Sequence, residues 1–297
     1  YVQDHGLANN KMAFPTIDRL RKVVYEDLSI NYYEEPDQDV DKVLDIFIRV
    51  NSGGTVLSYS DLLLSIATAQ WTDLDAREEI HGLVDELNNQ LGQRFSFSKD
   101  VVLKAGLVLT DVSDIGFKVT NFNRTNMARL EADWPKIEAA LLLAGGLLAD
   151  FGFSDATLTA DSVLIPIAYY VHRRQLGDSY RLAGKHDADR AAVRQWVVKT
   201  LVKPGVWGSG LDTLLRDLRR VIDDHGADGF PTTQLESAMS ARGKALTFSA
   251  EEIDDLIETP YTSKRAFPLL ALLFPGTNTR NLHHIDHVFP RSKFQER

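Results

Sequence analysis

Apolar residues recur at helical spacing along most of the chain. Val40, Val43, Leu44, Phe47 and Ile48 occupy positions i, i+3, i+4, i+7 and i+8, which form one stripe on a helix. The same period, interrupted by glycine and proline, predicts further helices. Their expected spans are 59–71, 74–92, 98–111, 126–150, 159–176, 187–202, 210–225, 231–241, 249–258 and 264–274. The pattern therefore predicts a mainly α-helical chain with a multi-helix body.

Both ends of the chain depart from this pattern. Residues 1–38 show no helical period, and residues 28–33 alternate like a strand rich in β-branched and aromatic side chains. Because one strand is not stable alone, we expect residues 28–33 to be the remaining edge of an α/β domain. From residue 277 the sequence turns rich in histidine and indicates another domain. The predicted domains are 1–72, 73–276 and 277–297.

Composition narrows the class of protein. The chain has 297 residues and no cysteine, which excludes disulfides and thiolate metal ligands and fits a cytoplasmic protein. No apolar run reaches the roughly 18 residues that a membrane span needs, so we expect no membrane partner. The most apolar stretch, residues 139–149, contains Gly145 and Gly146 and predicts a buried helix.

Charge is distributed unevenly. The net charge of −9 argues against a protein that coats DNA nonspecifically. Residues 262–297, however, carry six Lys or Arg against two Asp or Glu. Such a basic end can arise by chance, but a nuclease needs positive charge only where phosphate binds. The distribution is therefore compatible with DNA as a partner.

The segment with the clearest chemical signature is Asp286-His287-Val288-Phe289-Pro290. In an extended strand, neighbouring side chains point to opposite faces, so Asp286 can hold a metal while His287 faces an attacking water. Neutral imidazole is a good base near pH 7. Two other interpretations remain open, namely a polar tail and a structural zinc site formed by His283, His284 and His287.

Residues 286–294, Asp-His-Val-Phe-Pro-Arg-Ser-Lys-Phe, resemble the first half of an HNH (His-Me finger) nuclease. The resemblance implies the start of a ββα-metal domain, with His287 as general base and Asp286 as ligand of Mg²⁺ or Mn²⁺. The family completes this site with an Asn and with a second His or Asn on a following helix. Neither occurs in the sequence after Asp286, so we expect the chain alone to cleave little or no DNA.

A second motif lies at residues 47–58, Phe-x-Arg-x-Asn-x-Gly-Gly-x-x-Leu-Ser. A Gly-Gly loop between helices is often structural, although its backbone N–H groups and Arg49 can also cradle an anion. The motif resembles the end of the ParB/sulfiredoxin-like N-terminal domain of GmrSD-type modification-dependent restriction enzymes. That resemblance implies a nucleoside triphosphate and modified DNA as ligands, with Arg49, Asn51, Gly53 and Gly54 as candidate contacts. The Asp-Gly-Gln-Gln-Arg signature of that domain does not occur in the sequence.

Several cations are weaker candidates for contacts with the DNA backbone. They are Lys264, Arg265, Arg291 and Lys293, followed by residues 172–174 and by Arg216, Arg219 and Arg220 on a predicted helix. More often such residues form a solvated face. The four tryptophans are scattered, which favours core anchors over a base-stacking platform.

Together the motifs predict part of a metal-dependent restriction or phage-defence DNA endonuclease that responds to modified DNA and to nucleotide. We expect DNA as its partner, and a homo-oligomer. The alternatives are a non-catalytic scaffold that binds DNA or a protein partner, and a nucleotide-dependent sensor that does not cut.

Overall fold

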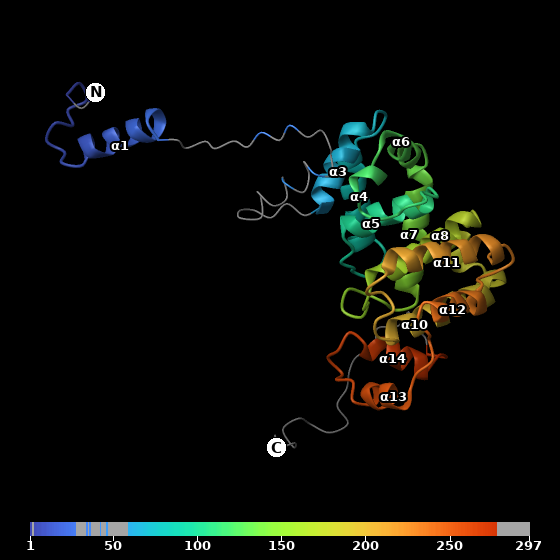
Figure 1. Ribbon diagram of the computed structural model, residues 1–297. Helices are drawn as coiled ribbons and strands as arrows, with labels where there is room; N and C mark the ends of the chain where they lie inside the picture. The colour runs from blue at the N-terminus through green and yellow to red at the C-terminus, as the bar shows by residue number, and fades with distance from the viewer. Residues whose placement is uncertain are drawn as a thin grey trace, which may run out of the picture. The chain divides into compact units, whose positions relative to one another are not determined.

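A computed structural model of the chain describes residues 1, 3–27, 34, 36, 42, 46 and 59–277 (Figure 1). The chain separates into two units, Tyr1–Val50 and Asn51–Arg297. The predicted strand at 28–33 lies outside the described residues. The predicted helix after Asp39 is described only at Lys42 and Ile46, which are both helical. The predicted domain boundaries at 72 and 276 stay predictions.

The first unit contains the helix α1, Ala13–Tyr25. The prediction of irregular structure is therefore wrong over these residues. Phe14, Ile17, Leu20 and Val24 recur at helical spacing, and Pro15 is tolerated because it lies in the first turn. No residue of α1 is buried, and Phe14 and Val24 are more than half exposed. Burial among the described residues therefore contributes little to this helix.

The second unit is a body of helices. Its described helices are α3 (Tyr59–Gln70), α4 (Ala76–Asn89), α5 (Lys99–Leu109), α6 (Arg124–Ala132), α7 (Trp134–Asp150), α8 (Leu164–Arg173), α9 (Ser179–Leu182), α10 (Asp187–Val202), α11 (Leu211–His225), α12 (Thr232–Ala241), α13 (Ala250–Ile257) and α14 (Ala266–Leu273). Short 3-10 turns occur at Val119–Asn121, Asp161–Val163 and Gly184–His186. The described residues include no strand, and the prediction of a mainly α-helical chain is confirmed.

The structure corrects two details of the predicted helices. The expected helix 126–150 is two helices, α6 and α7, which meet at Asp133. Pro135 lies in the first turn of α7, where the missing N–H is tolerated, and its ring is incompatible with an uninterrupted helix. The carbonyl of Asp133 accepts the first hydrogen bonds of α7, from the N–H groups of Lys136 and Ile137. The four-residue helix α9 was not expected.

Helices α7 and α8 form the centre of the second unit. Helix α7 buries residues on all sides, as expected for an apolar helix without a polar face. A Cβ on Gly146 would lie 2.6 Å from Nη1 of Arg181. Glycine therefore allows the Arg181 guanidinium to lie against α7, where its Nε donates to Oδ2 of Asp150 at 2.8 Å. The predicted buried helix at 139–149 is confirmed.

The tryptophans are core anchors, as the sequence predicts. Trp71 and Trp134 are buried, and their rings meet edge to face with centroids 5.3 Å apart. Trp196 is fully buried and meets the half-buried Trp207 at 5.9 Å. No described helix combines the length and the hydropathy that crossing a membrane requires.

The remaining helices are arranged around this centre. In Figure 1 the second unit runs from α3 and α4 through α7, α8 and α11 to α13 and α14. Helix α11 packs against α8 and α12, while α10 packs against α14 and α12. This packing places the turn before α14 beside the C-terminal end of α10, which is where the candidate site lies.

The carboxylate of Glu131 ties α6 to the loop after α3. Its Oε1 accepts three backbone N–H groups, from Thr72 at 2.8 Å, Asp73 at 2.6 Å and Leu74 at 3.0 Å. Burial opposes ionisation, but these donors outweigh it and hold the pKa of Glu131 below its usual value. The charge of Glu131 therefore stabilises the fold at neutral pH.

We expect Glu131→Gln to lower the free energy of unfolding by about 2 kcal/mol at pH 7, since N–H donors bind a charged acceptor more strongly. The folded pKa is depressed, so this contribution is present above the unfolded value of about 4.3 and is lost as pH falls below it. Urea unfolding from about pH 7 down to pH 3 measures the difference. Glu78→Gln, an exposed glutamate on α4, is the control. An equal loss at all pH values would contradict the charge-based explanation.

Candidate nucleic-acid interface

Of the residues that the sequence predicts for a site, the structure describes Lys264 and Arg265 and the weaker candidates His172, Arg173, Arg174, Arg216, Arg219 and Arg220. Lys264 and Arg265 lie in the turn before α14, which begins at Ala266. The other candidates lie outside the described residues: Asp286, His287, Arg49, Asn51, Gly53, Gly54, Arg291 and Lys293. The assigned roles of all these residues stay predictions.

Lys264 and Arg265 line a cavity of about 470 Å³, called the Lys264 pocket below. Its walls come from three separate parts of the second unit. These are Thr159 and Ala160 before α8, residues 200–208 at the end of α10 and in the following loop, and residues 263–265 before α14. Helix packing therefore joins segments that lie more than a hundred residues apart in the sequence.

The cations of this pocket differ in how they are compensated. Nζ of Lys203 donates to both carboxylate oxygens of Glu252 and, at 2.7 Å, to the carbonyl of Thr247, so its charge is neutralised. Within the described part of the chain, the side chains of Lys264 and Arg265 have no ion pair. The Lys264 pocket therefore has uncompensated positive charge at its rim.

The carboxyl of Asp161 interacts electrostatically with Lys264. Burial raises the pKa of the Asp161 carboxyl, and the positive charge of Lys264 opposes that rise. The two groups act through space, since no hydrogen bond or ion pair joins them in the described chain. Lys264 therefore stays available to an external anion.

The loop after α10 gives the pocket a firm wall. Gly205 has a φ of +74°, a conformation that favours glycine. Nζ of Lys244 donates to the carbonyls of Gly205 at 2.9 Å and Val206 at 2.6 Å. Trp207 packs against Trp196 in the core. These contacts hold the loop in place from both sides. The contacts of Lys203 and Lys244 in this pocket could not be predicted from the sequence pattern.

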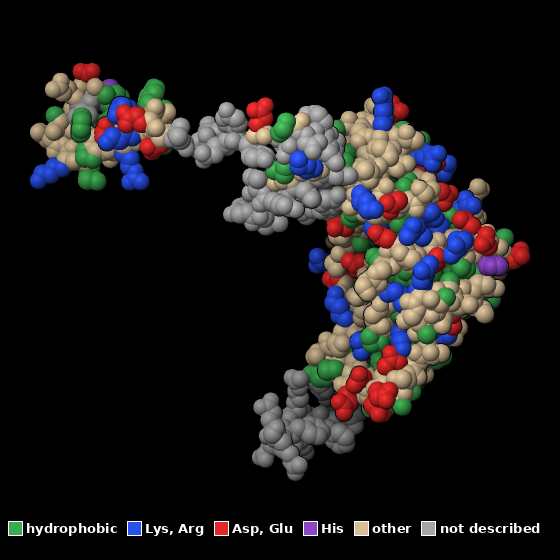
Figure 2. Space-filling model, in the orientation of Figure 1, with side chains coloured by type: hydrophobic (Ala, Val, Ile, Leu, Met, Phe, Trp, Pro, Cys, Tyr) green, Lys and Arg blue, Asp and Glu red, His purple; other side chains and the backbone are tan. Residues whose placement is uncertain are grey.

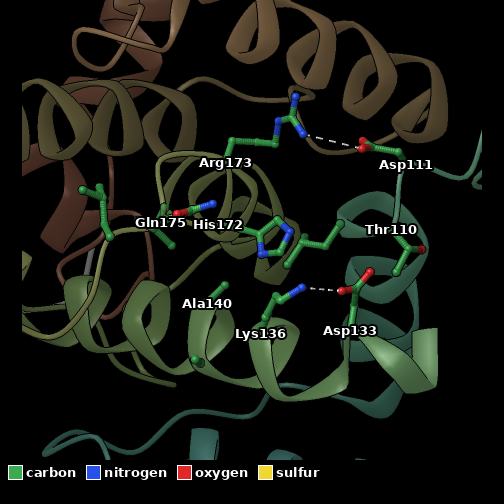
Figure 3. A pocket seen from close by; sticks show the side chains of 12 residues that line it. Thr110, Asp111, Asp133, Lys136, Ala140, His172, Arg173 and Gln175 are labelled. Atoms are coloured by element: carbon green, nitrogen blue, oxygen red, sulfur yellow. Dashed lines mark hydrogen bonds and ion pairs between the residues drawn. The ribbon is translucent and has the colours of Figure 1, made fainter. Parts of the chain in front are cut away.

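A second cavity, of about 630 Å³, lies where α5 and α8 end and α7 begins (Figure 3). His172 lies between two ion pairs in Figure 3. Arg173 and Asp111 form one, at 3.8 Å between Nη1 and Oδ2, and Lys136 and Asp133 form the other, at 2.8 Å. Burial lowers the pKa of His172, so its imidazole is neutral at pH 7.

The charges around His172 are satisfied within the protein. Nε of Arg173 binds Oδ1 of Asp223 at 2.6 Å, and the hydroxyl of the buried Tyr169 lies 2.9 Å from Asp111 and 2.8 Å from Asp223. Burial and these two acceptors raise the pKa of Tyr169. Unlike Arg173, Arg174 donates hydrogen bonds from Nη1 to the carboxylate of Asp189 and to the hydroxyl of Tyr170. Arg173 and Arg174 thus connect helices, and Arg174, which is largely buried in its ion pair, is not part of a solvated face.

The backbone around the His172 cavity is also unusual. Among the described residues, the non-glycine residues with positive φ are Asp111 at 57° and Gln175 at 50°. Both follow a helix C-terminus, where this conformation ends the helix, and both line the cavity. Since its cations are already paired, this cavity is a weaker anion site than the Lys264 pocket.

The described residues contain no cluster of three or more His, Asp or Glu side chains that could hold a metal ion. Asp286, the predicted metal ligand, lies outside them. No protein-family model and no curated protein matches the sequence. A function for the chain therefore rests on its own motifs and on the geometry described above.

Proposed function

We propose that the chain is part of a metal-dependent DNA endonuclease of the HNH type that acts in restriction or phage defence. The observation that carries the proposal is the segment Asp286-His287-Val288-Phe289-Pro290, with the trailing Arg291-Ser292-Lys293-Phe294. The Asn-x-Gly-Gly motif at 51–54 precedes it in the order expected of GmrSD-type enzymes, with a helical body between the two. Two motifs in this order support the proposal more than either motif alone.

In this proposal His287 is the general base. A neutral imidazole with a pKa of about 6.5 takes a proton from the water that attacks phosphorus, while the bond to the 3′ oxygen breaks. Asp286 would hold Mg²⁺ or Mn²⁺, which supplies positive charge to the phosphate and to the leaving oxygen. Lys264, Arg265, Arg291 and Lys293 would bind neighbouring phosphates.

The Lys264 pocket supports the DNA part of this proposal. It places two uncompensated cations in the turn before α14, so they are near in sequence to the HNH segment. Phosphate contacts position a protein on DNA without reading its sequence. In the same proposal Arg49, Asn51, Gly53 and Gly54 would cradle the phosphates of a nucleoside triphosphate, and the N-terminal domain would sense a DNA modification.

The proposal is tested by incubating the full-length protein with supercoiled plasmid, with and without Mg²⁺ or Mn²⁺. Unmodified DNA and DNA carrying modified cytosines are compared, each with and without nucleoside triphosphate. We expect nicked and linear DNA in the presence of metal, and none with EDTA. Binding without nicking under every condition would contradict a nuclease and favour the non-catalytic scaffold.

A further inference from the structure

The Lys264 pocket is one end of a longer depression. A second hollow of about 430 Å³ is lined by Gly205, Thr213 and Arg242, among others, and a third of about 450 Å³ by Thr213, Arg216 and Arg242. Gly205 also lines the Lys264 pocket, while Thr213 and Arg242 line both other hollows. The three hollows therefore adjoin one another. We call them together the cationic groove.

The groove is positively charged on an acidic chain. Eight Lys or Arg residues line it against three Asp, whereas the whole chain has a net charge of −9. Figure 2 shows Lys and Arg side chains, interspersed with acidic ones, over the face that carries α11 and α12. A groove whose lining is locally positive is a footprint of nucleic-acid binding.

Several of these cations bond only neutral atoms, so their charge remains available. Nη1 of Arg219 donates to the carbonyl of Val112 at 2.8 Å, and Lys244 donates to two carbonyls of the loop after α10. Arg216 is exposed, and the hydrogen bond that its side chain makes among the described residues runs from Nη2 to the hydroxyl of Thr213, at 3.4 Å. A carbonyl orients a cation without neutralising it.

Asp217 forms ion pairs that orient the guanidinium groups of Arg220 and Arg242. Its side chain is 11% exposed and binds Arg220 at 2.7 Å through Oδ1 and Arg242 at 2.5 Å through Oδ2. One carboxylate thus holds two cations, whose side chains remain 69% and 48% exposed. The trio keeps one uncompensated positive charge and offers N–H donors to solvent. Such a fork suits phosphate oxygens.

We propose that the cationic groove binds the sugar-phosphate backbone of duplex DNA, and that it extends the contacts of Lys264 and Arg265 across α11 and α12. One small anion cannot reach cations that lie on three separate elements, whereas a polymer with regularly spaced phosphates can. Among the described residues, the aromatic side chain lining the groove is Trp207, which packs against Trp196. Single strands are held largely by stacking on aromatic side chains, so this lining favours a duplex. The choice of DNA rests on the proposed function.

The test is equilibrium binding of a short fluorescein-labelled duplex to the full-length protein, followed by fluorescence anisotropy across a series of NaCl concentrations in EDTA. We expect Arg216→Glu/Arg220→Glu to raise Kd at least about tenfold and to lower the slope of log K against log salt by about two. Both side chains are exposed, but Arg220 pairs with the buried Asp217, so thermal unfolding is measured to check that the variants keep the fold. Arg216→Gln/Arg220→Gln is expected to act in the same direction with a smaller loss.

The matched control is Arg124→Glu/Arg129→Glu on α6, which changes the net charge equally at exposed positions outside the groove. Its Kd is expected to stay within about twofold of the wild type, because these positions make no phosphate contact in the groove. Equal weakening by both pairs, or no weakening by either groove pair, would overturn the proposal. So would a wild type that binds no duplex, or that prefers single strands. Because EDTA prevents cleavage, this binding assay does not depend on nuclease activity. Groove-dependent binding in EDTA, together with no nicking in the plasmid assay with Mg²⁺ or Mn²⁺, would sink the nuclease proposal and leave the groove assignment standing.

Discussion

His287→Ala is expected to lower the rate of plasmid nicking by the full-length protein by about 10²- to 10⁴-fold, the usual contribution of a general base. Alanine cannot accept the proton of the attacking water, while Asp286 and the phosphate contacts are unchanged. The rate is measured from the conversion of supercoiled to nicked DNA under single-turnover conditions with Mg²⁺ or Mn²⁺. DNA binding in EDTA is expected to stay at the wild-type level, because a base acts on the reaction rather than on affinity.

His283→Ala is the control that separates catalysis from a structural zinc site. If His287 is the base, the His283 variant keeps most of the cleavage activity. If His283, His284 and His287 hold zinc, both variants lose bound zinc and melt at a lower temperature. Atomic absorption and thermal unfolding measure these two quantities. Undiminished cleavage by His287→Ala would remove this residue from the mechanism.

Asp189→Ala is expected to lower the free energy of unfolding by about 3 to 5 kcal/mol, because it removes one acceptor shared by four donors. Oδ2 accepts the hydroxyls of Tyr170 at 2.7 Å and Tyr180 at 2.8 Å, as well as Nη1 of Arg174. Oδ1 accepts the N–H of Phe230 at 2.7 Å. Both tyrosines are fully buried, so their hydroxyls lose the Asp189 carboxylate as an acceptor inside the core.

Asp187→Ala provides the matched comparison for Asp189→Ala. Asp187 lies in the first turn of the same helix, α10, and its side chain is 71% exposed in an ion pair with Arg190. We expect a loss of no more than about 1 kcal/mol, since exposed ion pairs contribute little. Chemical denaturation of both variants at one pH measures the contrast. Similar losses in the two variants would contradict the assignment of Asp189 as the shared acceptor.

The positions of the helices could be predicted closely because helix formation depends on neighbouring residues. The predicted span 187–202 coincides with α10, and 231–241 differs from α12 by one residue at its start. The predicted helices differ from the structure at two places, and in both the local sequence contains the relevant signal. Pro135 divides the span 126–150, and α1 has apolar spacing within a segment whose overall pattern is irregular.

The candidate site was predicted less completely. Lys264 and Arg265 were found because they belong to a basic segment that can be read from the sequence. Lys244 and Arg242 gave no such signal, since the sequence around them is not basic enough to stand out. They become part of a groove only because α12 packs against α11 and the end of α12 approaches the loop after α10.

The sequence by itself determined that the chain is mainly helical and where most helices begin and end, and it contains the two motifs on which the proposed function rests. Those properties depend on residues within a few turns of one another. Only the tertiary structure decided which charges remain available. Asp217 neutralises part of Arg220 and Arg242, Glu252 neutralises Lys203, and Lys264 has no ion pair among the described residues, although its charge acts on Asp161. Asp217 and Arg220 are neighbours on α11, but Arg242 and Asp217, like Lys203 and Glu252, are distant in sequence, so these ion pairs follow from how the helices pack.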